Sequence, residues 1–278
     1  GIVFKGKTKK TTHNPLLQML DALNNGGDLE QHLDVDEILR YWAVSAMLAN
    51  FDSYPGSMLH NYYLYEKDDQ FSILPWDLNM SFGGFGQGIS YEQMVSAKID
   101  EPTTGPVANR PLIAKLLEIP EYAKRYHSYI RQLTEGYFEP TKFETRAREV
   151  QALIAPFVQE DPTKFYTYEQ FQQALDEAPT QSNMRGFGSA IAIIPCVTDR
   201  VANVQQQLNG TLPTKGDGSG LGMRGPLDRG MRPNMNELPG DTVDADAQAE
   251  RRWPPAGMPR PEGMQPPEGM QPPEGMQP

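Results

Sequence analysis

The chain has 278 residues, of which 38% are hydrophobic, and its net charge at pH 7 is −11. This acidic balance argues against nucleic acid or an anionic membrane as the main partner. The single cysteine, Cys196, excludes an intrachain disulfide, and its apolar neighbours indicate a buried thiol rather than a nucleophile. No signal peptide or transmembrane segment is recognised in the sequence.

The chain opens with a short basic stretch, residues 1–12, that has the composition of a strand end. We interpret this stretch as a solvated edge or linker. Phosphate contact is the weaker alternative, and its candidates are Lys5, Lys7, Lys9 and Lys10. Because the chain begins at Gly1 without Met, we expect it to be a fragment of a longer protein.

Two helices are predicted before residue 50. The first begins at Asn14, with Pro15 in its first turn, and ends before residues 24–27, Asn-Asn-Gly-Gly. The second begins at Asp34, a favourable N-cap residue followed by two acidic residues. Apolar residues cover much of its surface, so we expect a buried central helix. Asp52 then lies in the loop directly after it.

A β-hairpin is predicted next. Its strands, Asn61–Tyr65 and Phe71–Leu74, are rich in aromatic and β-branched residues, and five polar residues separate them. Pro75 ends the second strand, and Trp76 and Asp77 follow at once. Residues 81–88 contain four glycines, which indicates a mobile or tightly turned loop.

The second half is predicted to be helical up to about residue 210, after an irregular stretch at 91–110. Its apolar spacing predicts one helix that begins at Pro111 and further helices at residues 122–138, 143–158, 168–175 and 191–208. We expect Pro195 to interrupt the last helix and Asn209-Gly210 to end it. The fold class is therefore α+β, mostly helical with a small antiparallel hairpin.

The composition changes after Leu212, and the chain ends in three copies of the hexamer Pro-Glu-Gly-Met-Gln-Pro at residues 261–278. Such a segment buries too little apolar surface to offset its chain entropy. We therefore expect a folded domain at 1–212 and a disordered Pro/Gly/Met-rich tail at 213–278, with polyproline-II character. The tail would serve as a spacer or as a self-assembly arm.

Two aspartates flank the hairpin, Asp52 before it and Asp77 after it. A rigid hairpin can hold two hard oxygen ligands opposite each other, as Mg²⁺ and phosphoryl transfer require. The same order of parts occurs in the catalytic half of protein kinases. Taken alone the order is a weak signal, since turn residues would explain both aspartates and a core histidine would explain His60. The other histidines lack metal-ligand spacing, and no P-loop is present.

A literal resemblance adds to this order. Residues 33–54, LDVDEILRYWAVSAMLANFDSY, and 60–84, HNYYLYEKDDQFSILPWDLNMSFGG, resemble the signature of the CotH family of spore-coat kinases. The likeness continues with RPL at 110–112, PEYAKRY at 120–126 and DRVANVQQQLNG at 199–210. It covers roughly residues 1–212, nearly everything that is predicted to fold.

The resemblance implies an atypical protein-kinase fold that transfers the γ-phosphate of ATP to serines of coat proteins with Mg²⁺ or Mn²⁺. It assigns the catalytic-loop aspartate to Asp52 and a metal ligand to Asp77. Asn61 would be a second metal ligand near the nucleotide, and Trp76 would border the nucleotide site. Asn79 stands where many relatives have an aspartate, so we expect it to hold the metal less tightly.

The chain is thus expected to be mainly the carboxy-terminal lobe of a serine/threonine kinase, with the amino-terminal lobe upstream of Gly1. In this form it would bind ATP poorly. Its partners would be Ser-rich coat or surface proteins, and its location the bacterial spore coat or the cell surface. The alternative is a non-catalytic coat or cell-surface assembly module. A metal-dependent hydrolase that uses the same two aspartates is a third, weaker hypothesis.

Overall fold

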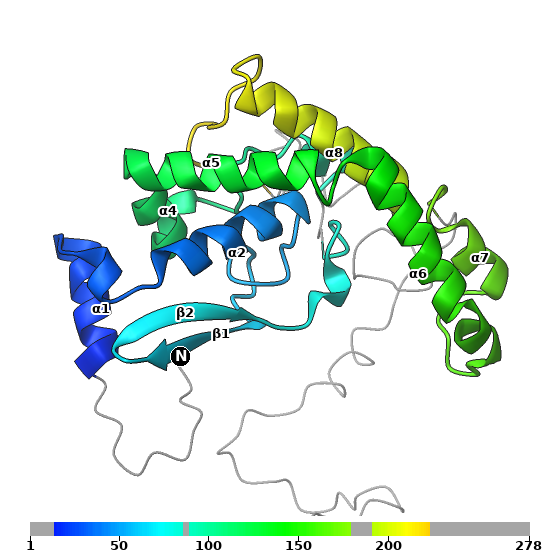
Figure 1. Cartoon of the computed structure of the whole chain (residues 1–278), viewed down its shortest axis with the longest axis horizontal. Helices are drawn as coiled ribbons and strands as arrows, with labels where there is room; N and C mark the ends of the chain where they lie inside the picture. Colours follow the sequence, from blue (N-terminus) through cyan, green and yellow to red (C-terminus); the bar gives the residue numbers. More distant parts are fainter. Residues whose placement is uncertain (1–13, 86–88, 179–190, 223–278) are drawn as a thin grey trace, which may run out of the picture. The chain divides into compact units, whose positions relative to one another are not determined.

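The computed structural model describes residues 14–85, 89–178 and 191–222 (Figure 1). They all belong to the first of the two units into which the chain divides, residues 1–230 and 231–278. The expectations for the basic stretch at the start of the chain and for the hexamer repeats fall outside these residues.

The described residues are mostly helical with one two-stranded antiparallel sheet, which confirms the α+β class. The regular elements are α1 (Asn14–Asn25), α2 (Val35–Met47), β1 (Tyr62–Lys67), β2 (Gln70–Pro75), α3 (Tyr91–Val95), α4 (Pro111–Leu117), α5 (Pro120–Glu135), α6 (Pro140–Glu160), α7 (Tyr168–Gln173) and α8 (Ile193–Leu208). Short 3₁₀ turns lie at η1 (Leu29–Gln31), η2 (Leu78–Met80) and η3 (Val107–Asn109). The order helix, loop, hairpin and helices is the predicted one.

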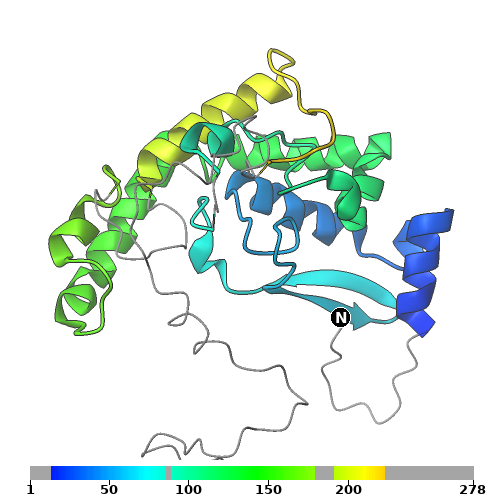
Figure 2. The same ribbon diagram turned by 180° about the vertical axis from the view of Figure 1, so that it is seen from behind.

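Helix α2 is the centre of the core. The Asp34 carboxylate accepts a hydrogen bond from the backbone N–H of Glu37 at 3.0 Å, which confirms the predicted N-cap. Trp42, Ile38 and Leu39 are fully buried. Helix α2 packs against α5 on one side and β2 on the other, so it forms the middle layer between the hairpin and the helices (Figures 1 and 2).

The hairpin is longer and its turn tighter than predicted. The strands pair from Tyr62 opposite Pro75 to Lys67 opposite Gln70. Only Asp68 and Asp69 form the turn, with φ of 54° and 64°. Two successive left-handed residues make the primed turn that matches the twist of a hairpin, and aspartate tolerates this conformation better than most side chains. Phe71 and Ile73 bury the inner face against α2.

Helices α6 and α7 form an arm beside the core. Phe143 anchors the start of α6 by stacking on Phe138, with ring centroids 5.8 Å apart. The rest of α6 runs away from α2 and carries α7 beside it (Figures 1 and 2). Arg148 joins α6 to the turn just after α7 through a two-pronged ion pair with Asp176, at 2.6 and 3.1 Å.

Two further features differ from the expectations. Pro195 does not interrupt α8, because the helix begins at Ile193 and a proline in the first turn lacks only an N–H that has no helical partner. Residues 213–222, which we assigned to the tail by composition, lie beside residues 100–107. The backbone N–H of Asp100 donates to Thr214 at 3.0 Å, and Thr104 pairs with Leu221. Within the described residues, no helix is both long and apolar enough to cross a membrane.

Candidate functional site

The loop after α2, residues 50–56, is buried throughout, although it carries three polar side chains. The hydroxyls of Ser53 and Tyr41 are 2.7 Å apart and hydrogen-bonded, which fixes the loop to α2. The backbone N–H of Gly56 donates to the Ser53 carbonyl at 3.0 Å, so the loop turns sharply just after Asp52. Buried polar loops are stable only when their groups are paired, and this loop is paired largely by one distant arginine.

That arginine is Arg110, whose side chain is buried beneath the loop. Its Nε donates to the carbonyl of Tyr54 at 2.7 Å, and its Nη2 donates to the carbonyl of Gly56. A third bond, from Nη1, reaches the carbonyl of Asn109 at 3.1 Å. The planar guanidinium supplies several donors in a fixed geometry, which suits it to hold adjacent carbonyls. Arg110 therefore fixes the backbone that follows Asp52.

Asp52 is buried, with 6% of its surface exposed, and its two carboxylate oxygens differ. Oδ2 accepts a hydrogen bond from the Asn61 amide at 3.0 Å. Oδ1 lies 3.2 Å from Nε2 of His60, an ion pair when the imidazole is protonated, but accepts no hydrogen bond from a described residue. Among the described residues, Oδ1 is thus a buried acceptor without a donor. An unpaired buried carboxylate oxygen is costly, so this atom is ready to accept a proton or a ligand.

Burial is the main cause that raises the pKa of Asp52 above its ordinary value of 3.8. The positive charge of His60, when protonated, and the Asn61 hydrogen bond act in the opposite direction. The negative charge of Asp77 adds to the increase, so the two carboxylates lie close enough to interact. A perturbed carboxylate beside a second carboxylate is typical of sites that bind cations or move protons.

Asp77 is exposed and has a left-handed backbone, with φ of 51° and ψ of 66°. A non-glycine residue in this region costs free energy, and such residues gather at functional sites. Its side chain does not cap the η2 turn that follows. The carboxylate is therefore presented outward instead of being used to stabilise local structure.

Three backbone hydrogen bonds hold the Asp77 segment against residues on either side of the Asp52 loop. Trp76 N–H donates to the Asn61 carbonyl at 3.2 Å, where the strands part. Beyond η2, the Phe82 N–H donates to the Leu48 carbonyl at 2.6 Å, and the Gly83 N–H donates to the Ala49 carbonyl at 3.2 Å. A Cβ at Gly83 would lie 2.0 Å from the Met94 sulfur, so only glycine fits there without movement. The chain is thus tied down on both sides of Asp77.

The structure brings three of the candidate site residues together and leaves two at the surface. Asn61, Asp52 and Asp77 form the group described above, with His60 at its edge. Trp76 is 58% exposed and packs edge-on against Tyr63, with ring centroids 5.7 Å apart. Asn79 is exposed in η2.

The donor set fits a hard divalent cation. Since the Asn61 amide nitrogen donates to Asp52, its amide oxygen remains available as a ligand. The outward carboxylate of Asp77 adds anionic oxygens, the type that Mg²⁺ and Mn²⁺ prefer. Among the described residues, no group of three or more His, Cys, Asp or Glu could hold a metal ion, so a metal site here would combine the Asp77 carboxylate with an amide oxygen.

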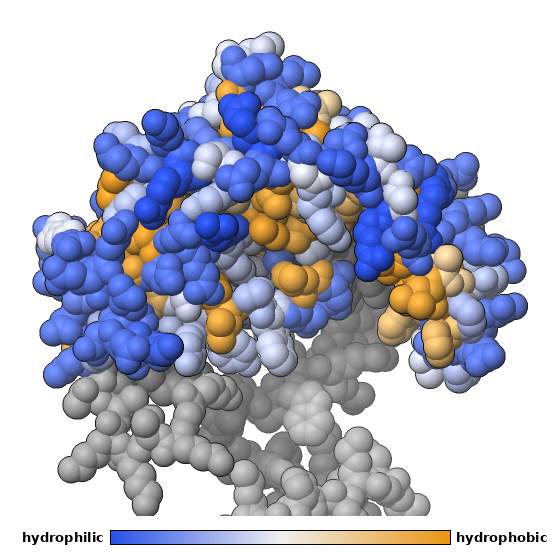
Figure 3. Space-filling view, in the orientation of Figure 1, coloured by the Kyte–Doolittle hydropathy of each residue, from blue (hydrophilic) through white to orange (hydrophobic). Residues whose placement is uncertain are grey.

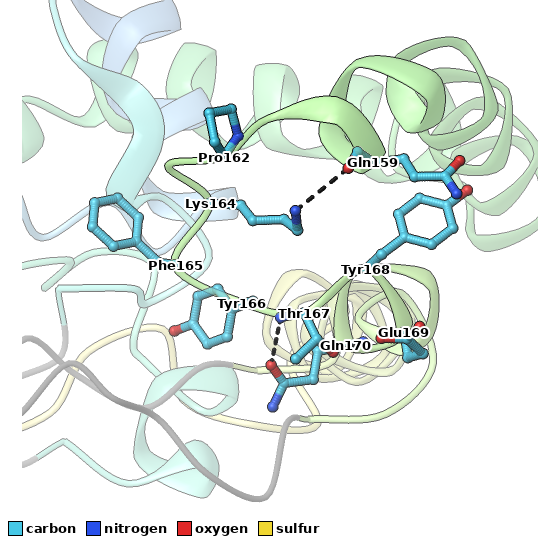
Figure 4. Close-up of a pocket in the computed structure, with 9 residues that line it drawn as sticks. All are labelled: Gln159, Pro162, Lys164, Phe165, Tyr166, Thr167, Tyr168, Glu169 and Gln170. Atoms are coloured by element: carbon cyan, nitrogen blue, oxygen red, sulfur yellow. Dashed lines mark hydrogen bonds between the residues drawn. The ribbon is translucent and has the colours of Figure 1, made fainter.

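Two surface hollows lie elsewhere. One, of about 250 Å³, lies between α2 and the end of β2 and is lined partly by Tyr41, Pro75 and Leu78, next to Asp77. The other, of about 500 Å³, lies at the tip of the arm between Gln159 and Gln170 (Figure 4). Neither hollow is lined by Asp52 or Asp77, so the site lies outside both.

Sequence reasoning alone missed the residues that support the site. Arg110 stood only in a short stretch of family likeness, and nothing local indicated its contacts with residues 54–56. The role of Gly56 was also missed: a Cβ there would lie 1.6 Å from the Phe51 carbonyl oxygen. A lone arginine before a proline-started helix is the signal that was present, but it does not identify the loop that the arginine holds.

Comparisons with known proteins identify the family of the chain. The sequence model of the family described as "CotH kinase protein" matches residues 4–185, and this match confirms the resemblance seen in the sequence. The chain is 28% identical over 153 residues to "Inner spore coat protein H" of Bacillus subtilis (strain 168). The alignment covers 54% of this chain but only 38% of that relative.

Proposed function

The chain belongs to the CotH kinase protein family, and from this premise we propose that it is a serine/threonine protein kinase that transfers the γ-phosphoryl group of ATP to hydroxyls of coat or surface proteins. The proposal includes an atypical kinase fold, in which the described residues correspond mainly to the carboxy-terminal lobe. It also includes dependence on Mg²⁺ or Mn²⁺.

The observation that carries the proposal is the placement of Asp52 and Asp77 at the base of the hairpin, where Asn61 bonds to Asp52 through its amide and to the backbone N–H of Trp76 through its carbonyl. One carboxylate is buried, oriented by Asn61 and left with an unpaired oxygen. The other is exposed on a left-handed residue and raises the pKa of the first. Phosphoryl transfer needs one group that positions the attacking hydroxyl and another that places a cation beside the phosphates.

In this proposal Asp52 acts on the attacking hydroxyl. Its unpaired Oδ1 accepts the hydrogen bond of the substrate hydroxyl and then its proton, while Oδ2 stays bonded to Asn61. The raised pKa suits this role, because a carboxylate with a higher pKa is a stronger base. Arg110 keeps the loop backbone in place, so the backbone next to Asp52 does not have to be reordered when substrate binds.

The metal-binding role falls to Asp77 and to the amide oxygen of Asn61. A bound Mg²⁺ or Mn²⁺ supplies neutralisation of the phosphate charge. Asn79 lies two residues after Asp77, where it would offer a neutral amide oxygen instead of a carboxylate. Trp76, with its exposed ring next to Asp77, would border the nucleotide.

We further propose a location in the bacterial spore coat, since the relative from Bacillus subtilis is named an inner spore coat protein. The chain spans 38% of the length of that relative, so the activity and the partners of the whole relative are not carried over with the match. Ser-rich coat proteins remain the proposed substrates.

A second candidate is a non-catalytic assembly module of the coat. The observation that favours it is the set of exposed apolar side chains on the arm, which no chemical role at Asp52 requires. The two functions are distinguishable, because an assembly module would not depend on either aspartate.

The dependence of phosphate transfer on metal concentration tests the kinase proposal. The full-length protein, with any residues that precede Gly1, is incubated with γ-labelled ATP, a serine-rich peptide, and Mg²⁺ or Mn²⁺ over a range of concentrations. We expect transfer that needs the metal, and Asp77→Asn should raise the metal concentration for half-maximal transfer by about tenfold or more. Asp69→Asn is the matched control, because it is also a left-handed aspartate but lies in the hairpin turn. Transfer that is equal in both variants would refute the assignment of Asp77.

A further inference from the structure

Helix α6 carries an apolar stripe that the other described elements cover only in part. Its members are Val150, Leu153, Ile154 and Phe157. Leu153 is 70% exposed and Phe157 is 72% exposed. Figure 3 shows apolar surface over the far half of α6, close to the loop that leads to α7. The positions i, i+3, i+4 and i+7 lie on one face of a helix, which is the pattern of a helix that packs against another helix.

The partners that α6 already has lie toward the start of the same face. Phe143 and Ala147 pack on the main core, and Gln151 donates to two backbone carbonyls of the neighbouring α7. Phe143 and Ala147 extend the stripe toward the start of the helix at intervals of four and three, so the core covers that end of the face and leaves the other end exposed. The exposed end of the stripe is therefore available to a partner outside the described residues.

The spacing of the stripe is symmetric about its own centre. Read from either end, the intervals are three, one and three, with the midpoint between Leu153 and Ile154. When an identical helix lies antiparallel to it, Leu153 faces Ile154 of the second copy and Val150 faces Phe157. A two-fold axis brings the same patch of both chains together, so a patch with this symmetry is complementary to itself.

The charges at the ends of the stripe have the same symmetry. Arg146 lies one turn before the stripe and is 61% exposed on its side chain, and Glu160 lies just after it. In an antiparallel pair each Arg146 approaches Glu160 of the other copy, at both ends of the contact. A parallel pair would instead place like charges together, which costs free energy.

We propose that this protein forms a two-fold symmetric dimer through antiparallel contact of α6 with α6 of a second copy. The stripe exposes on the order of 400 Å² of apolar surface, below the roughly 800 Å² per partner of a standard interface. The dimer is therefore weak and concentration-dependent, with a dissociation constant on the order of tens of micromolar. This inference is independent of the kinase proposal, because both aspartates lie away from α6.

Sedimentation velocity of the full chain, from about 1 μM to about 1 mM, tests the dimer. We expect the weight-average mass to rise from one chain to two across this range. Leu153→Asp should weaken dimerisation by about tenfold or more, because it places a charge at the centre of the contact. Leu17→Asp is the matched control, since Leu17 is 59% exposed on α1 and should leave the dimer intact. A monomer at all concentrations, or a dimer unchanged by Leu153→Asp, would overturn the proposal.

Charge exchange and cross-linking test the geometry. Arg146→Glu and Glu160→Arg should each weaken the dimer, and the double variant should restore it. Leu153→Cys should form an intermolecular disulfide on mild oxidation, since position 153 lies beside the two-fold axis, whereas Arg146→Cys should not. The native Cys196 is buried, which keeps it from competing. Failure of the double variant to restore the dimer, or cross-linking at 146 but not at 153, would overturn the antiparallel arrangement.

Discussion

Arg110→Lys is the substitution that most sharply tests how the Asp52 loop is held. Arginine donates to the carbonyls of Tyr54, Gly56 and Asn109 from a buried position. Lysine keeps the positive charge but replaces the fork by one ammonium on a flexible stem. It can satisfy one of these carbonyls well, so the others lose their donor in a region that water does not reach.

The size of the effect follows from these bonds. A hydrogen bond that involves a charged group contributes roughly 1.5–3 kcal/mol, and a buried carbonyl without a donor costs a similar amount. With one or two bonds lost and part of the charge interaction kept, we expect a loss of about 3 kcal/mol in the free energy of unfolding. For a domain of this size, that corresponds to a decrease in Tm of roughly 6–12 °C.

Urea denaturation followed by far-ultraviolet circular dichroism measures this loss. The slope of the transition should stay unchanged while its midpoint falls, because the folded state exposes no new surface. Arg146→Lys is the control: its side chain is 61% exposed and bonded only to Glu149 within the described residues, so its effect should stay within about 0.5 kcal/mol. A loss below about 1 kcal/mol for Arg110→Lys would refute the reasoning that Arg110 holds the loop.

Two further predictions concern the same loop. Gly56→Ala should cost about 2 kcal/mol or more, because its Cβ would lie 1.6 Å from the Phe51 carbonyl oxygen; a change under about 0.5 kcal/mol in the urea assay would contradict this close approach. Asp52→Asn should raise Tm at pH 7, since burial and the charge of Asp77 raise the pKa of Asp52 and make its ionised form costly to fold. The folded protein binds this proton more tightly than the unfolded chain, so the cost is removed as the pH falls toward 3.8. The Tm difference should therefore shrink with falling pH, and a constant difference between pH 7 and pH 4 would contradict the assignment.

Local patterns predicted much of the fold. The Asp34 cap, the apolar surface of α2 and the aromatic strands are short-range signals, and each describes an element that the structure contains. The hairpin bounds were less accurate. Glu66 and Lys67 are polar and were assigned to the connection, yet they lie in β1, because an exposed strand end does not require apolar side chains.

Contacts between distant segments could not be predicted in this way. Arg110 binds the carbonyls of Tyr54 and Gly56, which lie 56 and 54 residues earlier in the chain. Leu221 pairs with Thr104 across more than a hundred residues. Residues 213–222 lack apolar periodicity, so their composition indicated a tail. Their attachment comes from backbone hydrogen bonds, which leave no trace in side-chain composition.

The residues of the candidate site could be predicted from the sequence, but their burial and backbone conformation could not. The order of the motifs placed Asp52 and Asp77 on either side of the hairpin. It did not reveal that Asp52 is buried with one unpaired oxygen, or that Asp77 has a left-handed backbone. These properties depend on how the loops pack against α2. They are also what makes the pair suitable for chemistry.

The most direct test of the account is the rate of phosphoryl transfer by Asp52→Asn relative to Asp68→Asn, with saturating ATP, metal and a serine-rich peptide. Both changes replace a carboxylate by an amide of the same shape, but Asp68 lies in the turn at the far end of the hairpin. We predict that Asp52→Asn lowers the transfer rate by about 10²–10⁴-fold and that Asp68→Asn leaves it unchanged. The assay uses the full-length protein with any residues that precede Gly1, and equal rates in the two variants, or no transfer by the unmodified full-length protein, would contradict this prediction.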